Sequence, residues 1–137
     1  MISASDSVGG VLLDTHVILW LASEPERCGT AINVLSDPSV DLWISAVSTW
    51  ELAIKMSIGR LALPLSPADY VDSRRQRLRA LLVNIEHRHA GAVSELPMHH
   101  RDPFDRLLVA QAQLMELAIA TADPAFAEYD VPIVTVG

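Results

Sequence analysis

The chain contains a single cysteine, Cys28, among its 137 residues. One thiol cannot form an internal disulfide, and it leaves no second cysteine for a zinc site built on thiolates. No apolar run approaches the roughly 20 residues that a membrane-spanning helix needs. Residues 1–10 contain neither the basic segment nor the apolar segment of a signal peptide. These absences predict a soluble, cytoplasmic protein in a reducing compartment.

Basic residues are also scarce. The chain has 10 Lys and Arg against 17 Asp and Glu, which gives a formal net charge of −7. This balance argues against a protein that coats nucleic acid through an overall positive field. It does not exclude a nuclease, because acids that hold metal ions count as negative charges until the metal is bound. The one dense basic cluster, at residues 74–79, is typical of a solvated helix face, with phosphate contact as the alternative.

Hydrophobic residues make up 50% of the chain, and the length is that of one domain. We expect residues 11–137 to form this domain and residues 1–10 to be a flexible leader. Short apolar runs predict strands at 11–13, 42–44, 81–85, 117–120 and 132–136. Periodic segments and caps predict helices at 17–22, 30–35, 47–58, 67–78, 89–96 and 103–115. Strands that alternate with helices indicate an α/β fold whose central, mostly parallel sheet of four to five strands is covered on both faces.

Four acids are predicted at one edge of this sheet. Asp14 ends the first strand and Asp123 follows the fourth, while Glu51 and Asp105 lie early in helices. Carboxyl ends of parallel strands and amino ends of the following helices share one edge, where open α/β sheets keep their chemistry. We therefore expect at least three of these acids to converge.

Glu51 also has an unusual position within its predicted helix. At 100° per residue it lies within about 40° of the line through Val47, Ile54 and Ile58, which is predicted to face the core. A carboxylate on such a face is costly unless a cation or a hydrogen-bond donor meets it. A surface glutamate would need no such partner.

Carboxylates held close together predict a metal site. Like charges within about 4 Å repel and raise one another's pKa unless a divalent cation lies between them. Ligands that are all oxygens suit Mg²⁺ or Mn²⁺ better than zinc. Such ions also bind phosphate, which indicates hydrolysis of a phosphodiester by a metal-activated water.

Each acid also has a purely structural interpretation. Glu51 could pair with Lys55 one turn later, and Asp105 could favour the dipole of its own helix. Three aspartates precede predicted helices and are therefore candidates for N-caps: Asp14, Asp102 and Asp123. These interpretations do not explain why four acids share one edge.

The histidines show no spacing typical of metal ligands. His16 nevertheless stands out, because it lies close in sequence to Asp14. The other four are expected in loops and at helix caps: His87, His89, His99 and His100. The three tryptophans are expected in the core or at interfaces, in preference to platforms for base stacking: Trp20, Trp43 and Trp50.

Taken together, the motifs resemble a known family, the PIN-domain ribonucleases, and within it the VapC-type toxins of type II toxin–antitoxin systems. The resemblance runs from Leu12 to the C-terminus, essentially the whole domain. It is carried by Leu12-Leu13-Asp14-Thr15-His16 with Trp20, Ile44-Ser45-Ala46-Val47-Ser48 with Trp50-Glu51, Ile54-Lys55, Gly59-Arg60-Leu61, His100-Arg101-Asp102-Pro103-Phe104-Asp105-Arg106 with Ala110-Gln111-Ala112, and Thr121-Ala122-Asp123 with Phe126. Two features depart from the family pattern: the length of residues 1–10, and Arg60 where lysine is frequent.

The resemblance implies a three-layer α/β/α PIN fold and an endoribonuclease that depends on Mg²⁺ or Mn²⁺. It also implies an RNA substrate, a small antitoxin whose C-terminal segment lies over the active site, and a homodimer. The implied catalytic residues and metal ligands are Asp14, Glu51, Asp105 and Asp123. Hydroxyl groups implied to support the site are those of Thr15, Ser48 and Thr121. The RNA contacts expected around it are His16, Arg101 and Arg106.

Two other functions remain as alternatives. A phospho-accepting receiver domain also gathers acids at the strand ends of a parallel sheet, but it needs a lysine near the last strand, and nothing basic follows Arg106. A PIN-like module without catalysis would bind RNA or a protein and leave RNA intact with any divalent metal.

Overall fold

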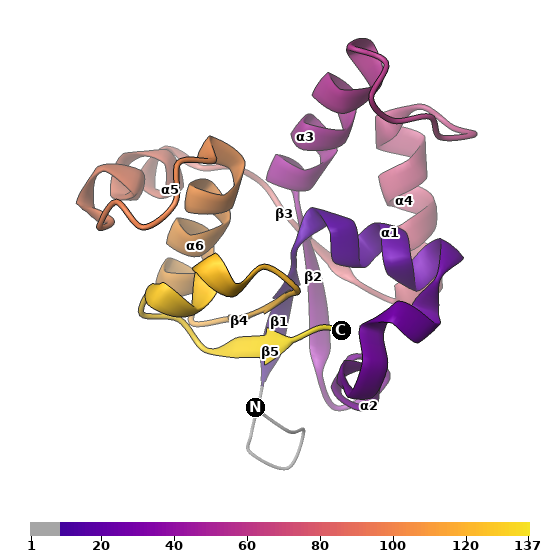
Figure 1. Cartoon of the computed structure of the whole chain (residues 1–137), viewed down its shortest axis with the longest axis horizontal. Helices are drawn as coiled ribbons and strands as arrows, with labels where there is room; N and C mark the ends of the chain where they lie inside the picture. Colours follow the sequence, from indigo (N-terminus) through magenta and orange to yellow (C-terminus); the bar gives the residue numbers. More distant parts are fainter. Residues whose placement is uncertain (1–8) are drawn as a thin grey trace.

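A computed structural model describes residues 9–137 and contains one sheet of five parallel strands (Figure 1). Neighbours in the sheet follow the order β3-β2-β1-β4-β5, and all four pairs are parallel. The strands are β1 (Gly10–Leu13), β2 (Asp41–Ser45), β3 (Leu81–Val83), β4 (Ala118–Thr121) and β5 (Ile133–Thr135). The predicted α/β class is confirmed, with the larger of the two predicted strand numbers. This order also differs from the 2-1-3-4-5 order of receiver domains, which argues against that alternative.

The helices connect these strands in the predicted sequence. They are α1 (Thr15–Ser23), α2 (Ile32–Leu35), α3 (Ala46–Ser57), α4 (Pro67–Leu78), α5 (His87–Ala92) and α6 (Pro103–Met115). Three short 3₁₀ helices complete the chain: η2 (Pro25–Ala31), η3 (Val93–Glu95) and η4 (Pro124–Glu128). Between residues 9 and 137, no helix is both long and apolar enough to cross a membrane.

Two predicted helices differ from the structure. Only the last four residues of the predicted helix at 30–35 are α-helical, because the chain turns at Gly29, whose φ is +61°, before α2 begins. The helix predicted at 89–96 begins earlier, at His87, and becomes 3₁₀ after Ala92. By contrast, α4 has the predicted bounds, with Ser66 capping its first turn and Pro67 at its first position.

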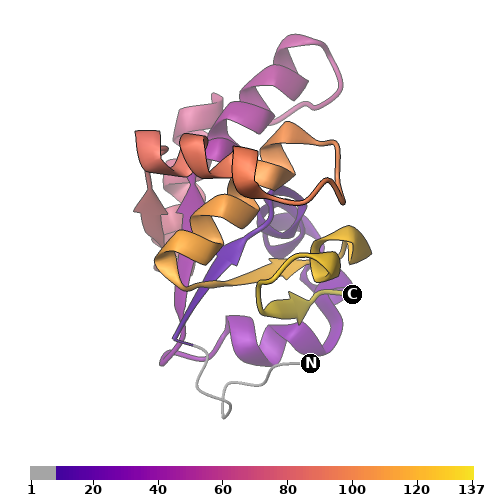
Figure 2. The same ribbon diagram turned by 90° about the vertical axis from the view of Figure 1, so that its left-hand side faces the viewer.

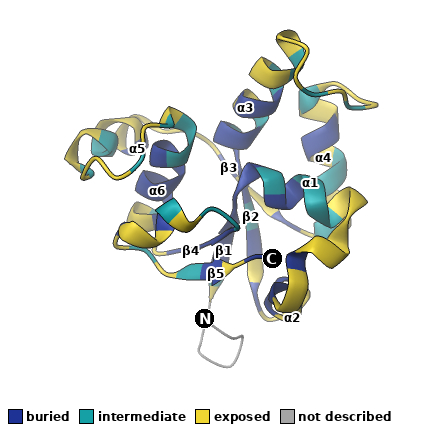
Figure 3. Ribbon diagram, in the orientation of Figure 1, coloured by how far each residue is buried: buried dark blue, intermediate teal, exposed yellow. Residues whose placement is uncertain are grey.

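Helices cover both faces of the sheet, and two cores result. In β1 the side chains alternate: Val11 and Leu13 pack with α1, α2 and α4, while Leu12 packs with α6 and η4. All three are fully buried, as Figure 3 shows for the centre of the sheet. Figure 2 shows α5 and α6 lying in front of the strands on the second face. The three-layer α/β/α arrangement therefore follows from a central strand that is apolar on both sides.

A side chain at Gly10, the first residue of β1, would require its neighbours to shift. A Cβ atom at this position would lie 2.6 Å from Leu117 Cδ2 and 3.2 Å from Trp43 Nε1. This residue of the predicted leader therefore belongs to the sheet. Residues 1–8 of the leader lie outside the described part of the chain.

The prediction for the apolar face of α3 is wrong beyond its first turn. Val47 is buried, but Ile54 and Ile58 are 37% and 59% exposed, and Trp50 is 47% exposed. The reason is visible in Figure 1, where α3 runs past the carboxyl edge of the sheet and has only α4 beside its second half. The first turns stay against the core, and Glu51 is among their buried residues.

Candidate active site

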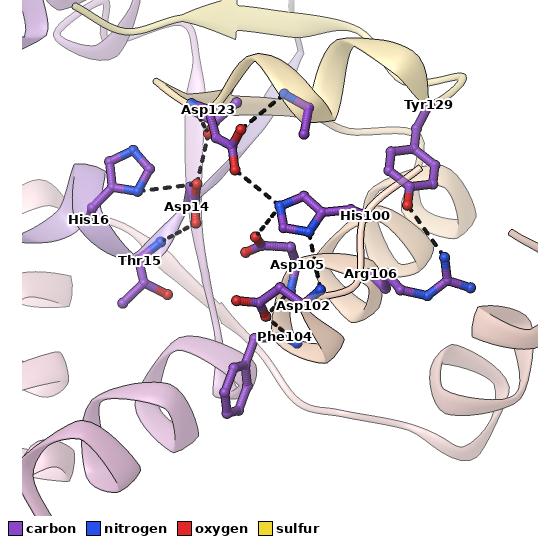
Figure 4. Close-up of polar contacts among 12 residues, drawn as sticks. Asp14, Thr15, His16, His100, Asp102, Phe104, Asp105, Arg106, Asp123 and Tyr129 are labelled. Atoms are coloured by element: carbon purple, nitrogen blue, oxygen red, sulfur yellow. Dashed lines mark hydrogen bonds and ion pairs between the residues drawn. The ribbon is translucent and has the colours of Figure 1, made fainter. Parts of the chain in front are cut away.

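The carboxyl edge of the sheet brings the four predicted acids together. Asp14 follows β1, Asp123 follows β4, and Glu51 and Asp105 come from the amino-terminal halves of α3 and α6. The charges of the other three acids contribute to the raised pKa of Asp105, which places all four within electrostatic reach of one another. Asp102 lies beside them and caps α6 through the amides of Phe104 and Asp105 (Figure 4).

Asp14 both caps α1 and faces the other acids. Its Oδ1 accepts a 2.8 Å hydrogen bond from the Thr15 amide, so the capping interpretation is correct. Its Oδ2 accepts a 2.7 Å bond from Thr121 Oγ1 and lies 3.3 Å from His16 Nδ1. Burial raises the pKa of Asp14, although His16 and the bonds from Thr121 and Thr15 oppose this rise. Capping and convergence thus occur in the same residue.

Glu51 is buried on the inner face of α3 and has two partners. Thr15 Oγ1 donates to Glu51 Oε1 at 2.7 Å and lies 2.9 Å from Ser48 Oγ. Lys55 Nζ lies 2.7 Å from the other oxygen, Oε2, as the predicted pair one turn apart requires. The exposed fraction of Glu51 is only 6%, so this carboxylate is held by a hydroxyl and an ammonium group away from bulk water.

Asp105 is the acid with the least compensation. Burial first, and then the charges of the neighbouring acids, together raise its pKa to about 8; these acids are Asp14, Asp102, Glu51 and Asp123. Its side chain is 13% exposed. A pKa near 8 means that Asp105 keeps its proton at neutral pH until a cation offsets the neighbouring charges.

Asp123 lies at the start of η4 and behaves in the opposite way. Its Oδ1 accepts a 2.9 Å bond from the Ala125 amide. Burial alone would raise the pKa of Asp123, but the bonds from Ala125 and His100 and the charges of His100 and His16 lower it overall. Thr121 joins the two strand-end acids, because its hydroxyl donates to Asp14 and accepts from the Asp123 amide at 3.0 Å.

His100 is the site residue that the sequence did not identify. Its Nε2 lies 2.9 Å from Asp105 Oδ2 and 3.0 Å from Asp123 Oδ2, between the two carboxylates (Figure 4). His100 was expected in a loop, and it does lie in the irregular segment before α6. The sequence did contain one indication, because His100 lies two residues before Asp102, the cap of α6. A segment that leads into α6 must approach the sheet edge where Asp105 lies in the first turn of that helix.

Most of the other predicted site residues lie close to the acids. Thr15, Ser48 and Thr121 lie among the acids and make the hydroxyl contacts described above. His16 also lies in the site, where its Nε2 accepts a 3.2 Å bond from the Ala122 amide. Arg101 is exposed.

Arg106 does not lie in the site. It is only 8% exposed, and its guanidinium donates to the carbonyls of Pro97 at 2.9 Å and Val93 at 3.0 Å, and to Tyr129 Oη at 3.3 Å. The bonds to Pro97 and Val93 tie the segment after α5 to α6, and the bond to Tyr129, drawn in Figure 4, ties α6 to the residue after η4. This geometry assigns Arg106 to the fold and argues against its predicted contact with RNA.

The donor set fits a hard divalent cation. Its atoms are carboxylate oxygens, which Mg²⁺ and Mn²⁺ prefer, and the charges of the neighbouring acids contribute to the raised pKa of Asp105. Oxygen ligands could come from Asp14, Glu51, Asp105 and Asp123. Ligand-type atoms of His100, Asp105 and Asp123 lie within 4.8 Å of one another.

Comparison with known proteins gives matches in sequence and in structure. The sequence model of the family described as PIN domain matches residues 11–132. The chain is 31% identical over 103 residues to Ribonuclease VapC22 of Mycobacterium tuberculosis, over 74% of this chain and 78% of the relative. It is 30% identical over 71 residues to Ribonuclease VapC16 of the same organism, over 49% of this chain and 50% of the relative.

Solved structures have the same fold at low sequence identity. VapBC2 from Rickettsia felis, bound to a DNA fragment from its promoter, has a TM-score of 0.70 at 12% identity, over 93% of this chain and 99% of that one. FitAcB from Neisseria gonorrhoeae has a TM-score of 0.61 at 20% identity, over 91% and 96%. A toxin–antitoxin complex from Klebsiella pneumoniae has a TM-score of 0.60 at 21% identity, over 91% and 96%.

Proposed function

This chain belongs to the PIN domain family, and we propose that it is a metal-dependent endoribonuclease and the toxin of a toxin–antitoxin pair. The observation that carries this proposal is the convergence of four acids on one sheet edge, where Asp14 and Glu51 are 4% and 6% exposed. Buried carboxylates are costly to keep together, so their convergence calls for a cation. Relatives named ribonucleases support RNA as the substrate.

In this proposal the carboxylates of Asp14, Glu51, Asp105 and Asp123 hold Mg²⁺ or Mn²⁺. When bound, the cation supplies positive charge that activates water and stabilises the charge on the phosphate during hydrolysis. The chain's own part is to keep these acceptors in fixed positions. Thr121 and the Thr15 amide orient Asp14, and the Thr15 hydroxyl orients Glu51. Ser48 lies 2.9 Å from the same hydroxyl and supports it from α3.

In this proposal, RNA is attracted to the site by the bound cation and by nearby basic side chains. The net charge of the chain is −7, so its overall field repels a phosphate backbone. Arg101 is the exposed basic residue nearest in sequence to His100, and we assign it to the RNA backbone. His16 is 35% exposed beside Asp14 and remains a candidate for a second contact.

The proposed partners are an antitoxin and a second copy of the chain. Solved structures with this fold include complexes described as VapBC and as a toxin–antitoxin complex, which supports the antitoxin. A cavity of about 400 Å³ lies between α3 and α4, and its walls include Trp50, Val71 and Leu82. Trp50 and Leu82 are 47% and 50% exposed, so this region presents apolar surface to a partner.

The test uses the purified chain, freed of any partner, and a mixed-sequence single-stranded RNA. We expect cleavage with Mg²⁺ or Mn²⁺, none after chelation, and recovery when the metal is restored. Asp14→Asn should reduce the rate by at least about a hundredfold, because it removes a charged ligand. Asp41→Asn, a matched change on the exposed start of β2, should leave the rate unchanged.

Two outcomes would contradict the proposal. Undiminished cleavage by Asp14→Asn would show that the nuclease activity does not use this site. Tight RNA binding with no product under either metal would instead favour the non-catalytic binding module.

A further inference from the structure

One ring nitrogen of His100 is held by the backbone. Its Nδ1 accepts a hydrogen bond from the Asp102 amide at 3.1 Å. A neutral imidazole carries one N–H, so the proton is on Nε2. This nitrogen forms a 3.0 Å hydrogen bond with Asp123 Oδ2 and lies 2.9 Å from Asp105 Oδ2 (Figure 4).

This form of His100 is not a metal ligand. A nitrogen that carries a proton has no lone pair to give to a cation. The short distances among His100, Asp105 and Asp123 therefore describe an N–H donor between two carboxylates.

The two carboxylates depend on this donor unequally. Asp123 also accepts a bond from the Ala125 amide. Asp105 Oδ2 lies 2.9 Å from the same His100 nitrogen, and among the described residues no backbone amide donates to this carboxylate. An N–H donor and a divalent cation compete for the same carboxyl oxygens, because both occupy the space between Asp105 and Asp123.

We propose that His100 is a placeholder for the cation, which holds Asp105 and Asp123 together in the metal-free protein and is displaced when the metal binds. The proposal rests on the proposed function in one respect, namely that the cation belongs to these acids. His100 precedes α6 in an irregular segment, and its side chain is 19% exposed, so the ring has a path outward.

His16 provides an internal comparison. Its Nε2 accepts from the Ala122 amide at 3.2 Å, which leaves the proton on Nδ1, 3.3 Å from Asp14 Oδ2. This N–H meets one carboxylate, and Thr121 donates to the same oxygen at 2.7 Å. Because His16 does not bridge two acids, the placeholder role falls to His100.

The test is the affinity of the metal-free protein for Mn²⁺, measured by isothermal titration calorimetry without RNA. We expect His100→Ala to bind Mn²⁺ about tenfold more tightly, because the variant no longer loses a charge-assisted hydrogen bond on binding. Its thermal unfolding in EDTA should occur at a lower temperature than that of the original chain. His99→Ala is the matched control, since His99 contacts Glu128 and the ring of Tyr129.

Other results would overturn the proposal. Weaker Mn²⁺ binding by His100→Ala would make His100 a ligand, and unchanged binding would make it a residue of the fold. If the original chain binds no Mn²⁺, the proposed function fails as well. If it binds Mn²⁺ and His100→Ala has the same affinity, only the placeholder fails.

A second measurement needs no variant. Long-range ¹⁵N–¹H spectra of the original chain in EDTA should show His100 protonated at Nε2 and unprotonated at Nδ1. Saturating Mg²⁺ should shift the Nε2 resonance while that nitrogen keeps its proton. A proton on Nδ1 in EDTA, or loss of the Nε2 proton with Mg²⁺, would contradict the proposed role.

Discussion

Asp105 makes the stability of the metal-free protein depend on pH. Its pKa is raised to about 8 from the ordinary 3.8, by burial first and by four neighbouring acids after that. The folded state therefore binds this proton more tightly than the unfolded state does. The stabilisation is fully present below about pH 4 and is lost as the pH rises towards 8.

The size of the effect follows from this window. One group loses at most about 1.4 kcal/mol of stability per pH unit inside it. The site is partly open to water, so we expect about 1–2 kcal/mol between pH 6 and pH 8. For a chain of this size that corresponds to a fall of about 4–8 °C in the midpoint of thermal unfolding.

The variant Asp105→Asn isolates this contribution. Asparagine resembles the protonated acid and does not ionise, so the variant should lack this part of the pH dependence. In EDTA, its unfolding temperature should exceed that of the original chain at pH 8 by more than at pH 6. Asp41→Asn should show no such divergence, because Asp41 is exposed at the start of β2. If the unfolding temperatures of Asp105→Asn and the original chain change in parallel from pH 5 to pH 8, the inferred rise in the pKa of Asp105 is wrong.

Two further substitutions test neighbouring parts of the account. Thr121→Val removes the donor to Asp14 and keeps the shape of the side chain, so Mn²⁺ affinity by calorimetry should fall about tenfold. Thr135→Val on the exposed face of β5 is its control, and equal affinities for the two variants would contradict the role of Thr121. Arg106→Met leaves the carbonyls of Pro97 and Val93 and the hydroxyl of Tyr129 without their donor, so urea unfolding should show a loss of about 2–4 kcal/mol. A stable Arg106→Met protein with weakened RNA binding would return this residue to the substrate contacts. Arg101→Met, by contrast, should keep the stability of the original chain and bind RNA more weakly.

The sequence predicted those features that depend on local chemistry and strand order. A strand of three apolar residues followed by Asp14 was sufficient to predict the edge of the sheet, because parallel topology determines which ends meet. The bounds of α4 followed from a serine cap and a proline at the first position. Capping and metal binding appeared as alternatives for Asp14, yet one carboxylate does the first through Oδ1 and faces its neighbours through Oδ2.

The features that were missed depend on packing between distant segments. The apolar line of α3 was expected to face the core, but periodicity gives only the direction of a face and not how far the sheet extends beneath it. Arg106 follows Asp105 and looked like a surface cation, but the segment after α5 folds over it. His100 reaches Asp123 across 23 residues, a relation that no spacing rule contains.

The central claim is that the four acids act as one cation site that cleaves RNA. The most direct test is the rate of Mg²⁺-dependent cleavage of single-stranded RNA by matched variants: Asp14→Asn, Glu51→Gln, Asp105→Asn, Asp123→Asn and the control Asp41→Asn. The account predicts that each of the first four loses cleavage while its circular dichroism spectrum remains that of the original chain, and that the control cuts normally. Full activity in any of the four, or cleavage that persists without a divalent metal, would contradict it.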